Sequence, residues 1–135
     1  RGEGRQRNRY FVAHKLTEKQ KAILDSPPNR YKYNSQTGEV IGPSGKILKP
    51  SINSEGYASV GIYHKSLGST SIVVHRLAFA LRNIDIDGLV VHHDNEIKTD
   101  NRFKNLIPMT EKQHFELHHA RKLMVDEAMR NYENA

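Results

Sequence analysis

The sequence contains no cysteine. Disulfides, thiolate zinc sites and cysteine nucleophiles are therefore excluded, and any metal must be bound by His, Asp, Glu or Asn. No apolar run approaches the roughly 20 residues of a membrane span, and the first residues lack the apolar core of a signal peptide. We therefore expect a cytoplasmic protein with no membrane partner.

The length and the charge narrow the class of protein further. The 135 residues suffice for one domain with a modest core, and are too few for two independent ones. Lys and Arg outnumber Asp and Glu by 21 to 15, which gives a formal net charge of +6. Such an excess is typical of a protein that binds a polyanion. Because the sequence begins at Arg1 instead of a methionine, we expect it to be trimmed, processed or cut from a longer chain.

Residues 1–16 are predicted to form a flexible basic arm, because they offer little apolar surface to bury. Residues 17–30 are predicted to form a short helix and a linker. Thr17 is followed three residues later by Gln20, the pattern of a capping box, and the helix ends before Ser26-Pro27-Pro28. The arginines that alternate with Gly, Gln and Asn in the arm are Arg1, Arg5, Arg7 and Arg9.

Residues 31–84 are predicted to form a small antiparallel sheet followed by a short helix. Short runs of β-favouring residues alternate here with Gly, Pro, Asn and Ser. In the run 57–63 apolar residues alternate with others, so one face of that strand should lie on the core. Residues 76–82 are the expected helix. The expected strands are 31–34, 39–41, 46–49, 57–63 and 70–74.

The last third of the chain is predicted to consist of a strand, a polar loop, a second strand and a long helix. Thr110 and Gln113 form a second capping box, so the helix begins there and extends to about Tyr132. The expected segments are strand 89–92, loop 94–104 and strand 106–107. Together with the first turns of the helix they make up a core over residues 85–120. Residues 121–135 form the end of the helix.

Five polar residues in this core stand at spacings that suit a metal-assisted reaction. His114 and His118 lie four residues apart, so on a helix both imidazoles can bind one ion. His92 and His93 are neighbours on a strand and point to opposite faces, so one can be a third metal ligand while the other acts as a base. Asn105 follows twelve residues after His93. Phosphodiester hydrolysis needs both a metal, which stabilises charge, and a base, which activates water.

The helix face that carries the two histidines is predicted to continue as a buried stripe. Residues at this spacing are typical of a helix that packs on a core, so the histidines need not be solvated. The stripe consists of Arg121, Val125, Ala128 or Met129, and Tyr132.

These residues resemble a known family. Segments 91–94 (VHHD) and 99–106 (TDNRFKNL) resemble the core of the HNH (His-Asn-His, ββα-metal) endonucleases of phages and introns, and segment 110–118 (TEKQHFELH) resembles the metal helix of colicin-type DNases. The resemblance covers roughly residues 31–120. It implies an α+β fold, with a small antiparallel sheet, a ββα-metal core and a long C-terminal helix, and an HNH nuclease domain over 31–135. Upstream, segments 45–50, 56–57 and 74–77 resemble the sheet region of phage-type members.

The resemblance also implies a role for each of the five residues. His93 would be the general base, while His92, His114 and His118 would bind one divalent ion. Asn105 would brace the loop and orient His93 through hydrogen bonds. Many phage-type members have Asp or Asn at the position of His92 and Asn at that of His114, so this site is closer to the colicin type. Imidazole suits Zn²⁺ or Ni²⁺ better than Mg²⁺, and the candidate ions are Mg²⁺, Mn²⁺, Zn²⁺ and Ni²⁺.

The implied activity is metal-dependent cleavage of DNA to 5′-phosphate and 3′-hydroxyl ends, by a phage or mobile-element enzyme acting inside the host cell. With one active site, a monomer or weak dimer would nick one strand at a time. Two alternatives remain open: a catalytically silent DNA-binding module of the same fold, and a protein in which the three histidines hold a structural zinc. The expected phosphate contacts are Lys98, Arg102 and Lys112, with Arg5, Arg7 and Arg9 of the arm.

Three further sites complete the sequence-based expectations. Where the family usually has a glycine two or three residues after the base, this chain has Asn95-Glu96, so we expect a different loop conformation here. His75-Arg76 lies where a strand meets a helix, and we expect it to pack or to form hydrogen bonds instead of catalysing. His119 is expected to be exposed or to face phosphate.

Overall fold

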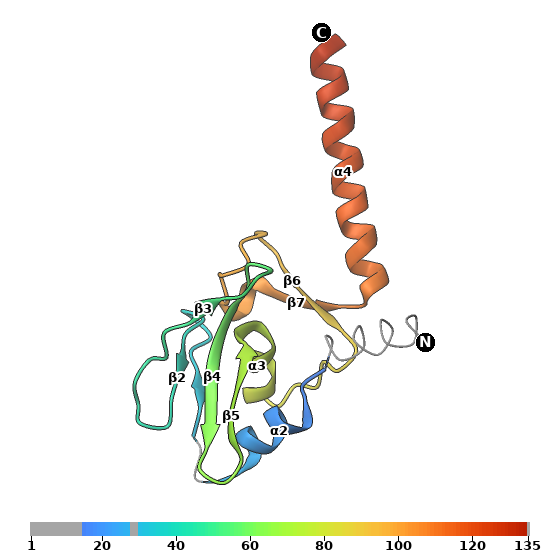
Figure 1. The fold of residues 1–135 in the computed structure, drawn as a ribbon. Helices are drawn as coiled ribbons and strands as arrows, with labels where there is room; N and C mark the ends of the chain where they lie inside the picture. The colour runs from blue at the N-terminus through green and yellow to red at the C-terminus, as the bar shows by residue number, and fades with distance from the viewer. Residues whose placement is uncertain (1–14, 28–29, 135) are drawn as a thin grey trace.

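The computed structural model describes residues 15–27 and 30–134, so Arg5, Arg7 and Arg9 of the predicted arm lie outside the described residues. The fold is α+β, as predicted, and ends in a long helix (Figure 1). None of the helices described is long and apolar enough to cross a membrane. The elements are α2 (Glu18–Asp25), β1 (Lys32–Tyr33), β2 (Val40–Ile41), β3 (Ser51–Ile52), β4 (Ala58–His64), β5 (Gly68–Val73), α3 (Val74–Leu81), β6 (Val90–His93), the 3₁₀ helix η1 (Phe103–Asn105), β7 (Leu106–Met109) and α4 (Glu111–Asn134).

Within the described residues, the strands form three small antiparallel sheets, with orders β1-β2, β3-β4-β5 and β6-β7. The predicted strand over residues 46–49 was wrong. Ile47 makes only an isolated bridge to Ile41, and the strand in this region is β3, which pairs with β4. Pro50 explains the shift, because it has no N–H to donate and restricts the residue before it, so regular pairing begins after it.

The main core lies between the β4–β5 hairpin, α2, β2 and the start of α3. Figure 1 shows how these elements are arranged. Side chains along β4 alternate between buried and more exposed positions, as the sequence pattern predicts. The capping box of α2 is present, with Gln20 N donating to Thr17 Oγ1 at 3.0 Å and Thr17 N donating to Gln20 Oε1 at 2.7 Å. The buried members of this core are Ile23, Val40, Ala58, Val60, Ile62, Ile72, Val74 and Leu77.

A second core holds the β6–β7 hairpin against α3. Arg76 on α3 donates to the carbonyl oxygens of Leu89, at 2.8 Å, and Ile86, at 3.0 Å. These bonds connect α3 to the chain that enters β6, and they are the kind of structural role predicted for Arg76. The backbone that leads into His92 and His93 is therefore anchored to α3. The buried members of this core are Ala78, Phe79, Ile86, Val91 and Leu106.

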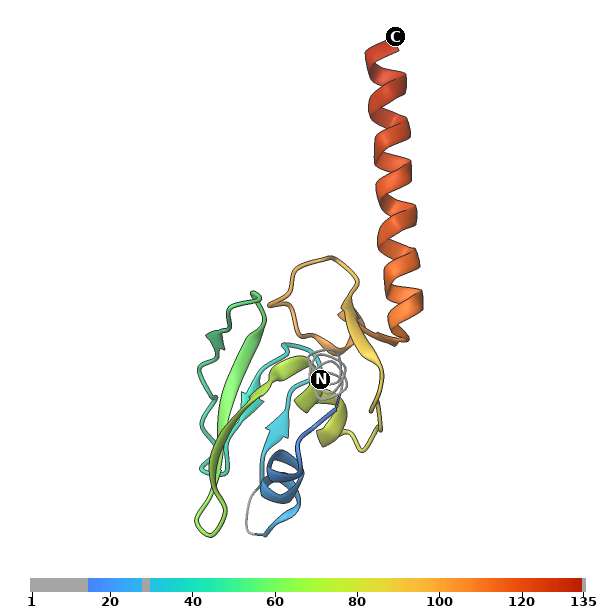
Figure 2. The same cartoon turned by 45° about the vertical axis from the view of Figure 1, so that its right-hand side comes forward.

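Helix α4 extends away from the rest of the protein (Figures 1 and 2). Its predicted capping box is present, since Gln113 N donates to Thr110 Oγ1 at 3.1 Å. The predicted buried stripe was wrong: Val125, Met129 and Tyr132 are 60%, 55% and 80% exposed. The reason is length, because 24 residues at a rise of about 1.5 Å each extend well beyond the short hairpin under the first turns.

Candidate metal centre and catalytic site

Three histidines from two elements converge on one point. His92 lies on β6, and His114 and His118 lie one turn apart at the start of α4. One ligand nitrogen from each lies within 4.8 Å of the others, and the Nε2 atoms of His114 and His118 are 3.0 Å apart. Because a zinc–nitrogen bond is about 2.0–2.1 Å long, two ligand nitrogens of one ion lie at most about 4.2 Å apart. The His114–His118 pair meets this limit, and side-chain adjustments of about half an ångström bring all three nitrogens within it.

The chemistry of these three side chains fits a divalent cation. His92 is 3% exposed, and its Nε2 is buried without a hydrogen-bond partner among the described residues. Burial lowers the pKa of His92, and the neighbouring His114 lowers it further. Burial also lowers the pKa of His114, with His118 adding to the effect. His92 and His114 are therefore neutral near pH 7, the form in which imidazole binds metal.

His93 lies on the other side of β6, away from the three converging histidines. Its Nε2 is 3.0 Å from Oδ1 of Asn101. Since the amide oxygen can only accept, the ring carries its proton on Nε2, and the lone pair is on Nδ1. Burial lowers the pKa of His93, while the hydrogen bond that its ring donates to Asn101 acts in the opposite direction. This neutral imidazole can accept a proton at Nδ1.

Asn105 braces the loop that leads away from His93. Its Oδ1 accepts from Asn95 N at 2.9 Å, and its Nδ2 donates to Asn95 Oδ1 at 2.9 Å and to the carbonyl of Asp100 at 2.8 Å. The side-chain partner of His93 is instead Asn101, which is buried and which sequence reasoning missed. The only sequence signal was that this polar loop contains several asparagines, because which of them reaches His93 depends on the loop's path.

Glu96 joins this loop to α4 and was also missed. Its Oε1 accepts from Arg121 Nη1 at 2.8 Å and lies 3.8 Å from Nδ1 of His118. Its φ is 63°, in the left-handed region that glycine adopts most readily. Glu96, one of the two residues that stand where the family usually has glycine, thus adopts a backbone conformation that favours glycine.

Of the predicted phosphate contacts within the described residues, two lie in the loop after β6 and one lies on α4, and their partners differ. Lys98 donates to the carbonyl of Glu55 at 2.9 Å. Arg102 forms a bidentate pair with Asp100, at 2.8 and 2.6 Å, and holds the pKa of that carboxyl well below its usual range. Lys112 on α4 is exposed. Lys98 and Lys112 are both exposed, with Lys112 Nζ 4.0 Å from Glu116 Oε1, whereas Arg102 is held in a close bidentate pair by Asp100.

A further buried imidazole packs beside His93. The ring centroid of His75 is 5.3 Å from that of His93 and 4.9 Å from that of Tyr57. Nδ1 of His75 has no hydrogen-bond partner in the described part of the chain. Burial, with contributions from His93 and Arg76, lowers the pKa of His75 to about 3. His75 therefore remains neutral and supports the ring of His93 by packing.

We expect the substitution His75→Leu to reduce the loss of stability in acid. The folded-state pKa of about 3 is below the ordinary value of 6.5, so below pH 6.5 the unfolded chain binds a proton that the folded chain does not. The stability from this group is present above pH 6.5 and is lost as the pH falls towards 3. Urea unfolding of both proteins at pH 7, 5.5 and 4.5 measures the difference. Equal losses in the two proteins would contradict this prediction.

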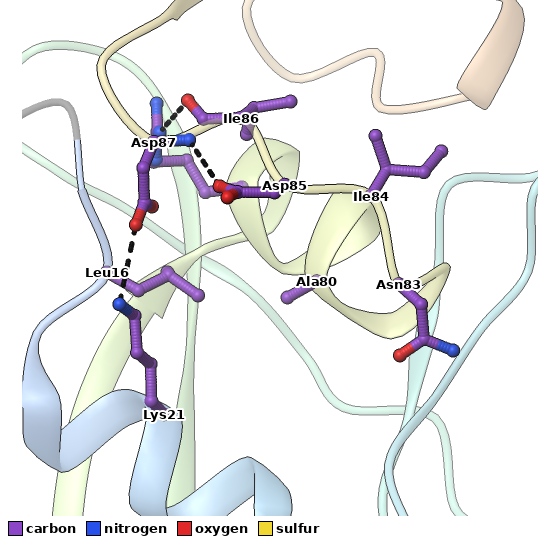
Figure 3. Close-up of a pocket in the computed structure, with 9 residues that line it drawn as sticks. Leu16, Lys21, Ala80, Asn83, Ile84, Asp85, Ile86 and Asp87 are labelled. Atoms are coloured by element: carbon purple, nitrogen blue, oxygen red, sulfur yellow. Dashed lines mark hydrogen bonds and ion pairs between the residues drawn. The ribbon is translucent and has the colours of Figure 1, made fainter.

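A separate hollow of about 360 Å³ lies between α2 and the segment after α3 (Figure 3). Lys21 Nζ is 3.4 Å from Asp87 Oδ2, and Asp87 N donates to Asp85 Oδ1 at 2.9 Å. The charged groups of this hollow are thus satisfied by one another and by the backbone, and none of the four site histidines lines it. The lining residues are Leu16, Lys21, Arg76, Ala80, Asn83, Ile84, Asp85, Ile86 and Asp87.

Comparison with known proteins connects this site to a family. The HNH endonuclease family matches residues 73–115, a span that includes His92, His93, Asn105 and His114 and ends before His118. A solved structure described as "DNA binding and cleavage by the HNH homing endonuclease I-HmuI" is similar, with a TM-score of 0.60 and 33% identity over 69% of this chain and 53% of that chain. The present chain thus spans about half the length of that protein. No curated protein matches the chain.

Proposed function

Because the chain belongs to the HNH endonuclease family, we propose that it is a metal-dependent DNA endonuclease that leaves 5′-phosphate and 3′-hydroxyl ends. The arrangement of histidines on the two sides of β6 carries this proposal. Three imidazoles converge on one side, and a neutral imidazole with a free lone pair lies on the other. The net charge of +6 also suits a nucleic acid substrate.

In this proposal His92, His114 and His118 hold one divalent ion through neutral ring nitrogens. When bound there, such an ion supplies Lewis-acid stabilisation of the negative charge on the phosphate and on the leaving 3′ oxygen. Three imidazole ligands favour Zn²⁺ or Ni²⁺ over Mg²⁺, which prefers oxygen ligands. The exposed position of His118, with its side chain 48% accessible, leaves one side of the centre open to DNA.

His93 accepts the proton of the attacking water at Nδ1. Asn101 holds the ring at Nε2 and so fixes the tautomer that keeps the Nδ1 lone pair free. Asn105 acts one step further away: it donates to the carbonyl of Asp100, the residue before Asn101, and so fixes the backbone from which Asn101 reaches the base. Packing against His75 limits rotation of the His93 ring.

The proposed substrate is duplex DNA, cut one strand at a time. One set of catalytic residues in a chain of this length makes one active site, so a monomer nicks and a double-strand break needs a dimer or a second visit. In this proposal Lys98 and Lys112 contact backbone phosphates, and their exposure at the surface supports this role. A phage or mobile element is the proposed source, by similarity to a homing endonuclease.

The direct test is incubation of the purified protein with supercoiled plasmid and Mg²⁺, Mn²⁺, Ni²⁺ or Zn²⁺. We expect open-circle product with at least one ion and none with excess chelator, and linear product only after open circles have accumulated. Gel retardation of the same plasmid measures binding in parallel. If the protein binds the plasmid but gives no cleavage product with any of the four ions, the proposal is contradicted and the protein is a catalytically silent DNA-binding module.

A further inference from the structure

The loop between β6 and β7 contains a glutamate in a conformation that costs energy for any residue with a Cβ atom. Glu96 has a φ of 63°, whereas glycine reaches this region without penalty. The backbone N of Glu96 donates to the carbonyl of His93 at 2.8 Å and closes a turn directly after that residue. Strained residues of this kind persist where their surroundings hold them, and they are common at functional sites.

The carboxylate of Glu96 lies behind one of the three converging histidines. It accepts from Arg121 at 2.8 Å and lies 3.8 Å from Nδ1 of His118, an ion-pair distance longer than a hydrogen bond. The other ring nitrogen of His118, Nε2, is 3.0 Å from Nε2 of His114. The carboxylate therefore lies beside Nδ1 of His118, while Nε2 is the nitrogen that faces the other histidines and would bind an ion. In metal sites this nitrogen usually faces a carboxylate or carbonyl, which fixes the tautomer and the direction of the ring.

We propose that Glu96 is a positioning residue of the metal centre: its carboxylate, held by Arg121, keeps His118 protonated at Nδ1 and its Nε2 directed towards the ion. This inference rests on the proposed metal centre. The same residue connects both halves of the site, because its backbone is bonded to His93 and its side chain reaches α4. Glu96 makes both connections while its backbone is in the left-handed conformation.

The alternative is that Glu96 forms only a surface ion pair with Arg121. The two side chains are 55% and 38% exposed, and pairs of this exposure contribute little to stability. The substitution Glu96→Gly separates the two possibilities, because it removes the carboxylate and also relieves the backbone. Glu96→Gln removes the charge and keeps the size of the side chain.

The experiment measures metal affinity without using cleavage. The metal-free protein and each variant are titrated with Zn²⁺ by calorimetry and with Co²⁺ by visible absorption, and the melting temperature of each metal-free protein is recorded. We expect both variants to bind about 10–100-fold more weakly than the unsubstituted protein. We also expect the metal-free Gly variant to melt at the same temperature or higher. The matched control is Glu116→Gln on the exposed side of α4, whose affinity should not change.

Glu96→Gly with an affinity within twofold of the unsubstituted protein would overturn the inference. So would a loss of affinity accompanied by a lower melting temperature of the metal-free Gly variant, since the effect would then be structural. An unsubstituted protein that binds the ion but does not cut DNA would overturn the proposed function and leave the role of Glu96 standing. One that binds neither Zn²⁺ nor Co²⁺ would overturn the metal centre and this inference with it.

Discussion

Replacing His93 with alanine is expected to slow DNA cleavage by about 10²–10⁴-fold, the usual contribution of a general base. Affinity for the ion should stay within a few fold, because His93 lies on the side of β6 away from the three converging histidines and is bonded to Asn101. Single-turnover rates on supercoiled plasmid, with ion in excess, measure the first effect. Calorimetric titration of the metal-free protein with Zn²⁺ measures the second.

Two further variants test whether a loss of activity in His93→Ala comes from misfolding. His93→Gln fills more of the buried space left by the ring and should lose as much activity as His93→Ala. His64→Gln replaces another buried histidine, whose Nε2 is 3.0 Å from the carbonyl of Pro27, and should keep its cleavage rate. A His93→Ala protein that cuts within tenfold of the unsubstituted rate would refute the assignment of His93 as the base.

Replacing His118 with alanine is expected to abolish both the cleavage and the stabilisation by metal. An ion present at about 100 times its dissociation constant stabilises the folded protein by about 2.7 kcal/mol, and the variant should gain almost none of this. The metal-free variant should be nearly as stable as the metal-free original, since the side chain of His118 is 48% exposed. Thermal melting of the unsubstituted protein and of the variant, each with and without Zn²⁺, gives the four melting temperatures that this comparison needs.

Removal of the ion by a chelator should lower the melting temperature and leave the protein folded. The two apolar cores, around Leu77 and around Phe79, do not include the three histidines, so the fold has its own source of stability. Complete unfolding on chelation, with no activity on adding metal back, would instead indicate a structural zinc protein. An equal metal-induced shift in the His118→Ala protein would show that the ion binds elsewhere.

Local patterns in the sequence predicted much of this arrangement correctly. The capping boxes at Thr17 and Thr110 are both present, because they involve residues only three positions apart. The spacing of His114 and His118 predicts that they share a helix face, and the structure places their rings 4.4 Å apart. Strand alternation likewise separates His92 from His93, since a strand turns successive side chains to opposite faces.

The features that could not be predicted depend on the path of the chain in space. A helical period shows which residues share a face, but not whether another element covers it, so the exposure of Met129 was missed. Asn101 becomes the partner of His93 only because the loop folds back over the strand. The role of Glu96 depends on a positive φ that glutamate rarely adopts.

The projection of α4 from the body has a mechanical consequence. Two of the three converging imidazoles lie on the helix and one lies on the hairpin, so an ion bound by all three would cross-link two rigid parts. The 24-residue helix is about 36 Å long, so a tilt of about 10° at its base would move the far end by about 6 Å. If the proposed ion binds, its occupancy and the direction of the helix are thermodynamically linked. A partner that binds the far end and favours one direction would change the affinity for the ion, and the ion would change the affinity for that partner by the same factor.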